Sequence, residues 1–167
     1  MSEPLSFFTI ASPIGALYAL TDNQALFYLG YSCDDARHYA SRHRLAVKSA
    51  ESPLTAPLRQ ELAAYFAGHL RRFTLPLQLL GTPFQLSVWQ ALGAIPYGRT
   101  ASYKDIAIAI RKPQASRAVG GANHHNPISI IIPCHRVIRA DGQVGGYGGG
   151  LARKEYLLSL EHRLGSS

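Results

Sequence analysis

The chain has 167 residues, of which 47% are hydrophobic and 16% charged, a balance typical of folded globular proteins. No stretch approaches the roughly 18 apolar residues of a transmembrane helix, so we expect no membrane partner. MSEPLSFF lacks a basic segment followed by an apolar core, so we also expect no secretory signal. With two cysteines, Cys33 and Cys134, the chain predicts no disulfide framework and fits a reducing compartment, the cytoplasm or a eukaryotic nucleus.

The net charge of +7 is concentrated in the second half of the chain. Residues 1–78 carry seven Lys/Arg and six Asp/Glu, whereas residues 79–167 carry ten and four. This asymmetry favours a polyanionic partner such as nucleic acid, although a solvated basic surface would give the same counts.

The first half of the chain predicts a small α/β domain. Apolar segments alternate with turn sequences over residues 6–31, which is typical of an antiparallel meander. A short polar helix is expected over 34–44, and a second over 58–66, where apolar side chains recur at helical spacing before Gly68. The segment 71–80 alternates like a strand, and its proline restricts it to a sheet edge.

A domain boundary is predicted at Gly81, giving domains 1–80 and 81–167. Just after it, Thr82 and Gln85 form a capping box with a proline at the first helical position. The sequence SYKDIAIAI predicts a second capped helix, and QASRAVGGANHH a third one with almost no side-chain bulk. A helix, a short turn and a thin helix that carries Arg117 are typical of a helix-turn-helix. The small residues of the thin helix would allow close approach either of a neighbouring helix or of a ligand as large as a nucleic-acid backbone.

The stretch IIPCHRV carries the candidate chemistry. We expect a buried strand over 128–132, followed by Cys134, whose thiolate would be favoured by the adjacent His135 and Arg136. Because neighbouring side chains on an extended segment point to opposite sides, a bridging water is expected between cysteine and histidine. Glu161, on a final amphipathic helix, is the best candidate to orient the histidine.

Simpler interpretations exist for these residues. Cys134 could be a small buried hydrophobic residue, and His135 with Glu161 a structural hydrogen bond. Tyr103 could be an aromatic side chain packed on the core, and Arg117 a solvated helix residue. A zinc cluster of these residues with His124 and His125 has poor ligand spacing, so we expect no metal.

Several of these segments together resemble the O6-alkylguanine-DNA alkyltransferase (methylated-DNA–protein-cysteine methyltransferase) family. They are PCHRV, the preceding NPISIII, the GYGGG loop, RAVGGAN, SYKDIA, GTPFQLSVWQALGAIPYG and, near the start, SPIGAL. The resemblance covers nearly the whole chain. It implies an α/β, RNase-H-like N-terminal domain followed by a mostly α-helical C-terminal domain with a helix-turn-helix.

The activity implied by the resemblance is suicidal DNA repair without a cofactor. The thiolate of Cys134 would take the alkyl group irreversibly from O6 of guanine in duplex DNA, with His135 as its base through water and Glu161 as orienting group. Asn126 would hold the turn to the active-site loop, and Tyr103 would hydrogen-bond the flipped base and help protonate the leaving guanine. Activity on O4-alkylthymine is left open.

The resemblance also implies the DNA-binding surface and the base pocket. Arg117 would enter the base stack of the duplex and fill the gap left by the flipped base. Further DNA contacts would come from Ser116, Ala118, Gly120, Gly121 and Asn123. The pocket for the base would be formed by Val137, Tyr147 and Gly148. We expect a monomer in solution, and the sequence leaves open whether it binds DNA cooperatively.

The chain departs from the pattern of the family at three places, one of which is a pair of residues. Arg111 replaces a small residue or glycine at the end of a helix and is a candidate phosphate contact. His124 and His125 replace a stretch that commonly includes glycine, and Gly148 can be serine in relatives.

Two other functions fit parts of the sequence. A lesion-binding module without transfer would share the domain but carry another residue in place of Cys134. A cysteine hydrolase would need an oxyanion site and would turn over many times.

Overall fold

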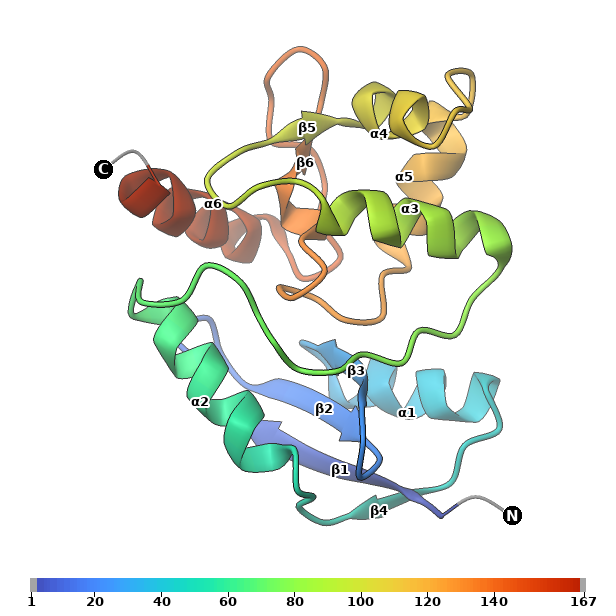
Figure 1. The fold of residues 1–167 in the computed structure, drawn as a ribbon, viewed down its shortest axis with the longest axis vertical. Coiled ribbons are helices and arrows are strands. Elements are labelled where there is room, and N and C mark those ends of the chain that lie inside the picture. The colour runs from blue at the N-terminus through green and yellow to red at the C-terminus, as the bar shows by residue number, and fades with distance from the viewer. Residues whose placement is uncertain (1–2, 166–167) are drawn as a thin grey trace. The chain divides into compact units, whose positions relative to one another are not determined.

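A computed structural model describes residues 3–165 of the chain (Figure 1). The chain divides into two compact units between Leu80 and Gly81. Each unit has its own secondary structure and its own buried side chains, and each is described separately below.

The first unit contains a four-stranded sheet in the order β3-β2-β1-β4. Its strands are β1 (Leu5–Ile10), β2 (Leu17–Thr21), β3 (Leu26–Gly30) and β4 (Val47–Ser49). The first three pair antiparallel, so the predicted meander is confirmed. The edge strand β4 runs parallel to β1 and was not predicted, because three residues, two of them exposed, give no clear alternation.

Two helices cover opposite faces of this sheet. Helix α1 (Cys33–Arg42) packs its Ala36, Tyr39 and Ala40 with Phe7 of β1. Helix α2 (Thr55–Phe66) lies on the other face, where the Arg59 guanidinium sits 6.0 Å from the ring centroid of Phe8. Both predicted helices are therefore confirmed. Successive side chains of β1 point to opposite faces of the sheet, so Phe7 contacts α1 and Phe8 contacts α2.

The strand predicted over residues 71–80 is wrong. Only Leu77 forms a bridge, parallel to Leu26. The Leu26 N–H donates to the carbonyl of Pro76, and the Gln78 N–H donates to the carbonyl of Leu26, each at 2.9 Å. Since Pro76 has no N–H of its own, it cannot extend this pairing into a ladder.

The second unit is mostly helical. Its elements are α3 (Pro83–Gly93), β5 (Ala101–Ser102), α4 (Tyr103–Ala109), α5 (Ser116–His124), the 3₁₀ turn η1 (Cys134–Arg136), β6 (Val137–Ile138) and α6 (Leu151–Gly165). The capping boxes predicted at Thr82–Gln85 and Ser102–Asp105 are both present, each with its two reciprocal hydrogen bonds. No helix within residues 3–165 is long and apolar enough to span a bilayer.

Helices α4 and α5 form the predicted helix-turn-helix (Figure 1). Two residues after the end of helix α4, Arg111 has a φ of +63°, and the N–H groups of Arg111 and Lys112 donate back to the carbonyls of Ile108 and Ala107, each at 2.9 Å. This is a Schellman ending with arginine at the position that glycine usually occupies. Helix α5 is fixed from its buried side, where the indole Nε1 of Trp89 donates to the Ala122 carbonyl at 2.9 Å.

The buried strand predicted over residues 128–132 is also wrong. The segment turns back on itself, with the Ile132 N–H donating to the Ile128 carbonyl at 3.1 Å and Ile130 at a φ of +73°. Ile128 and Ile130 are nonetheless buried. A run of apolar residues thus predicted burial correctly but not backbone conformation, since such runs do not distinguish a strand from a buried turn.

Candidate active site

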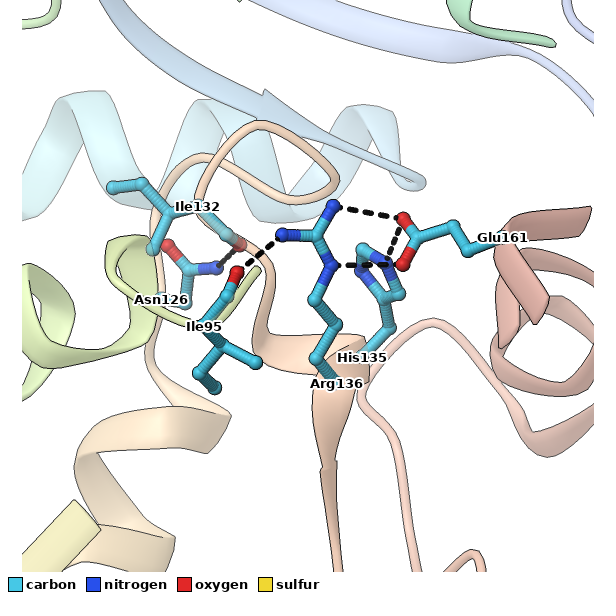
Figure 2. Close-up of polar contacts among 6 residues, drawn as sticks. All are labelled: Ile95, Asn126, Ile132, His135, Arg136 and Glu161. Carbon is cyan, nitrogen blue, oxygen red and sulfur yellow. Dashed lines mark hydrogen bonds and ion pairs between the residues drawn. The ribbon is translucent and has the colours of Figure 1, made fainter. Parts of the chain in front are cut away.

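Asn126 determines the shape of the turn that leads to Cys134. Its side-chain Oδ1 accepts from the Ile128 N–H at 3.0 Å. Its Nδ2 donates to the Ile132 carbonyl at 2.8 Å, the bond drawn in Figure 2. One amide therefore holds both ends of the turn and prevents the segment from extending into a strand. The same amide group lowers the pKa of the Cys134 thiol.

Cys134 is buried, with 5% of its surface exposed, and begins the 3₁₀ turn η1. The expectation of an extended backbone here is wrong. In a 3₁₀ helix, with three residues per turn, adjacent side chains still point in different directions. The imidazole of His135 accordingly bonds elsewhere, to Glu161.

Opposing effects act on the pKa of the Cys134 thiol. Burial raises its pKa, whereas hydrogen bonds from Asn126 and Tyr147 and the positive charge of Lys154 lower it. A buried thiol loses hydration as a thiolate, so these three side chains, together with a backbone hydrogen bond at Cys134, stabilise the charged form.

Glu161 is the centre of a buried network on α6. Its Oε2 lies 2.8 Å from Nε2 of His135, and Arg136 donates through Nε to Oε1 at 2.8 Å and through Nη2 to Oε2 at 3.0 Å. The remaining Arg136 nitrogen, Nη1, donates to the Ile95 carbonyl at 2.7 Å (Figure 2). Burial raises the pKa of Glu161, but the hydrogen bonds from His135 and Arg136 outweigh it and lower the pKa to about 2.

The network determines which nitrogen of His135 carries the proton. Burial, together with the charges of Arg136 and Lys154, lowers the pKa of His135 although Glu161 raises it, so the imidazole is neutral near pH 7. The ionised carboxylate of Glu161 can only accept, so Nε2 carries the hydrogen and Nδ1 keeps its lone pair. Within residues 3–165, Nδ1 is buried and has no hydrogen-bond partner, which leaves it available as a base.

Arg136 does not act as the sequence suggested. We expected its charge to favour the thiolate, but its guanidinium is directed at Glu161 and Ile95. The positive charge that acts on the thiol is that of Lys154, which the sequence analysis missed.

Lys154 is fully buried on α6 and joins two parts of the site. Its Nζ donates to the Val137 carbonyl at 2.7 Å and to the Gly146 carbonyl at 3.2 Å. Burial lowers the pKa of Lys154, and the nearby Cys134 raises it. Its spacing from Leu157, Leu160 and Glu161 places it on the buried face of α6, and this helical periodicity could have identified it.

Tyr103 lies at the first position of α4 and is partly buried. Burial and the charge of Cys134 raise its pKa, so the phenol remains protonated at neutral pH and is close enough to the thiol to sense its charge. A Cβ added to Gly120 would lie 3.7 Å from the Tyr103 ring, so the glycine borders this side chain.

The small residues of α5 differ in exposure. Arg117, Ala118 and Gly121 are exposed, and a Cβ added to Gly121 would meet no described atom within 4 Å. Packing within the chain therefore does not explain Gly121, which costs about 1 kcal/mol of helix propensity relative to alanine. Ser116 and Gly120 are partly exposed.

Asn123 differs from its predicted neighbours on the DNA surface because it is 93% buried. Its Oδ1 has no hydrogen-bond partner within residues 3–165. Asn123 therefore lies beneath the exposed surface of α5 rather than on it.

The predicted pocket residues lie in β6 and in the loop before α6. Val137 is buried, Tyr147 is partly exposed and hydrogen-bonds Cys134, and Gly148 is exposed. Asn126, Tyr147 and Lys154 thus act on the thiol of Cys134. Lys154 also connects Val137 to the loop before α6, through its bonds to the Val137 and Gly146 carbonyls. In the described part of the chain, no group of three or more His, Cys, Asp or Glu side chains could hold a metal ion.

Two family models together match nearly the whole chain. The ribonuclease-like domain of 6-O-methylguanine DNA methyltransferase matches residues 7–79, and the DNA-binding domain of the same protein matches residues 83–163. The methylated-DNA–protein-cysteine methyltransferase of Methanosarcina acetivorans is 44% identical over 153 residues, which cover 90% of this chain and 94% of that protein. The chain belongs to the 6-O-methylguanine DNA methyltransferase family.

Other relatives and solved structures agree with this family. A Mycolicibacterium paratuberculosis methyltransferase is 59% identical over 104 residues, which span 62% of this chain and 63% of that protein. A crystal structure of Mycobacterium tuberculosis OGT in complex with DNA is 45% identical, with a TM-score of 0.84 over 95% of this chain and 94% of that one. The expected fold class, a ribonuclease-like α/β domain followed by a helical DNA-binding domain, is confirmed.

Proposed function

We propose that the chain repairs duplex DNA by moving the alkyl group of O6-alkylguanine to Sγ of Cys134, once per molecule. The observation that carries this proposal is the neutral imidazole of His135, fixed by Glu161 with its Nδ1 unbonded, on the residue that follows the buried thiol of Cys134. A thiol that reacts needs a base, and the base needs an orienting group. The names and the DNA complex of the relatives support the same activity.

The proposed reaction has one substitution step. His135 Nδ1 takes the thiol proton of Cys134 through a water molecule, and Lys154 with Tyr147 and Asn126 stabilises the thiolate. Sγ then attacks the alkyl carbon, so that an S–C bond forms while the bond from that carbon to O6 breaks. The electron pair stays on guanine, which takes a proton from Tyr103. A thioether has no route back to a thiol here, so the protein is consumed.

The DNA must deliver its base to this buried thiol. A base inside a duplex is out of reach, so the guanine is flipped out, at a cost of a few kcal/mol. Arg117 on the exposed side of α5 fills the gap, and the bare surface at Gly121 lets the backbone of α5 approach the groove. Contacts of this kind depend on phosphates and shape, so little sequence preference is expected.

A titration tests the proposal. Increasing amounts of duplex with one O6-methylguanine are incubated with a fixed amount of protein, and repaired guanine is counted at the end of the reaction. We expect a plateau at one repaired base per protein molecule and none for Cys134→Ser. Repair that continues beyond one equivalent would contradict single-turnover transfer and favour a hydrolase.

A further inference from the structure

Two adjacent imidazoles lie at the C-terminal end of α5 and have no part in the proposed reaction. His124 and His125 are both exposed, and their ring centroids are 5.3 Å apart with the planes nearly perpendicular. Nδ1 of His125 hydrogen-bonds the Gly121 carbonyl, one helical turn earlier, at 2.8 Å. The second imidazole is therefore fixed against its own helix, and the first one packs on it edge to face.

His124 continues the exposed surface of α5 that we propose binds DNA. Arg117, Gly121 and His124 are separated by four and three residues, so they share one face of the helix. Arg117 and His124 stand at opposite ends of this face, about 10 Å apart along the axis at 1.5 Å per residue. Gly121, which has open space above it, lies between them.

The end of a helix where the histidines lie is unfavourable for phosphate. The unpaired carbonyls of a C-terminus carry a partial negative charge, which repels an anion and attracts a cation. An imidazole supplies that cation only when protonated, and it is the side chain whose ordinary titration range is pH 5 to 8. A duplex that follows this face would therefore favour the protonated form.

The neighbouring elements offer no competing carboxylate partner to these rings. Helix α3 has no ionisable side chain, and α4 presents Tyr103, Lys104 and Asp105, whose carboxylate caps its own helix through the Ser102 N–H at 2.9 Å. In residues 3–165 neither imidazole forms an ion pair.

The loop before α6 borders His124 on another side. A Cβ added to Gly148 would lie 3.8 Å from the His124 ring. The charged and titratable groups of this loop are Tyr147 and the exposed ion pair of Arg139 with Asp141, at 3.6 Å. In the first turn of α6, Arg153 donates to the Gly149 carbonyl at 2.9 Å. The counter-ion for a protonated histidine would thus come from outside the chain.

We propose that His124 and His125 form a proton-linked phosphate-binding site at the end of the DNA surface, so that binding of duplex DNA is accompanied by proton uptake. This inference rests on the proposed DNA-binding function and adds to it a dependence on pH. DNA binding becomes tighter and more sensitive to salt as the pH falls from 8 to 6, because each phosphate contact made by a cation adds about 0.9 to the slope of log K against log salt.

The test uses the full chain and undamaged duplex DNA, so that no alkyl transfer takes place. Equilibrium binding is measured at several salt concentrations at pH 6 and at pH 8. For the unaltered protein we expect the salt slope to be steeper at pH 6 by up to about 1.8, which corresponds to two imidazolium contacts. The double variant His124→Gln/His125→Gln should show the same slope at both pH values, with its melting temperature measured in parallel as a check of folding.

A matched control separates this site from general effects of pH. His162→Gln, at an exposed histidine in the last turn of α6, should keep the pH dependence of the unaltered protein. A folded double variant that keeps that dependence would overturn the inference, as would equal slopes at both pH values for the unaltered protein. Failure of the unaltered protein to bind duplex DNA at either pH would instead contradict the proposed function itself.

Discussion

Arg136 holds Glu161 by two parallel hydrogen bonds, Nε to Oε1 at 2.8 Å and Nη2 to Oε2 at 3.0 Å, in a buried part of the second unit. Such a bidentate pair fixes the carboxylate in position as well as in charge. His135 bonds one of the same oxygens, so the orientation of the proposed base depends on an arginine that does not approach the thiol.

Removal of this arginine should destabilise the protein. Arg136→Ala removes the positive charge that pairs with the buried Glu161 carboxylate, while the hydrogen bond to His135 remains, and removes the arginine donor to the Ile95 carbonyl, so we expect a loss of about 3–5 kcal/mol in the free energy of unfolding. Arg139→Ala is the control, since its ion pair with Asp141, at 3.6 Å, is exposed and contributes at most about 1 kcal/mol. Urea denaturation measures both. Equal effects of the two substitutions would show that the buried network is not structural.

Stability should decrease in acid because of Glu161. Its pKa in the folded protein is about 2, below the ordinary value of 4.5, so the unfolded chain binds the extra proton. The contribution of this group is complete above about pH 4.5 and is lost as the pH falls toward 2, a change of about 3 kcal/mol at 1.36 kcal/mol per pKa unit. The lowered pKa of His135 acts in the same direction below pH 6.5.

Glu161→Gln provides the comparison for this pH dependence. Between pH 6 and pH 3, the free energy of unfolding should decrease less for this variant than for the unaltered protein, although the variant is less stable at pH 6. Denaturation with urea at each pH measures this free energy. Parallel curves for the two proteins would mean that the acid sensitivity comes from other carboxylates.

Lys154 should set the pH range of the reaction as a positioning residue. Lys154→Met removes a positive charge near the Cys134 thiol, so the pKa of the thiol rises further. We expect transfer from free O6-benzylguanine to slow on the order of tenfold at pH 7, the effect of one pKa unit, and to recover as the pH is raised. Rates measured from pH 6 to 9 test this. A uniform loss at every pH would indicate a purely structural role, and no loss would exclude both roles.

Substitution of Gly121 by alanine should increase stability and weaken DNA binding. Gly121→Ala adds a methyl group into open space on an exposed helix, so we expect a gain of about 1 kcal/mol in stability. DNA affinity should nevertheless decrease, because the methyl group would stand between the helix and the groove. Gly93→Ala is the matched control, since it also meets no described atom within 4 Å but lies at the end of α3. Loss of DNA affinity in both variants, or in neither, would contradict the proposed surface.

Local signals in the sequence predicted most of the fold. Both capping boxes, the meander and the thin helix α5 follow from turn residues, spacing and helix-start signals that act within a few residues. The two wrong strands have a common cause, since apolar residues mark burial without specifying a partner. At residues 128–132 the backbone conformation is determined by hydrogen bonds from the Asn126 side chain to Ile128 and Ile132. These bonds cannot be inferred from the periodicity of apolar residues.

The site was less predictable than the fold. His135 and Glu161 are 26 positions apart, and their contact was expected only because few other carboxylates were available. The roles of Arg136 and Lys154 depend on three-dimensional packing, which directs the nearer cation at a carboxylate and the more distant one toward the thiol. Adjacency in sequence was therefore a poor guide to which charge acts on Cys134.

The central claim is that Cys134 accepts the alkyl group, and intact-protein mass spectrometry tests it most directly. The protein is incubated with a duplex that contains one O6-methylguanine, and the product is then digested to locate any adduct. The account predicts a single methyl-sized mass increase on Cys134, absent in Cys134→Ser and not found on Cys33. Tight binding of the damaged duplex without any adduct, or an adduct on another residue, would contradict it.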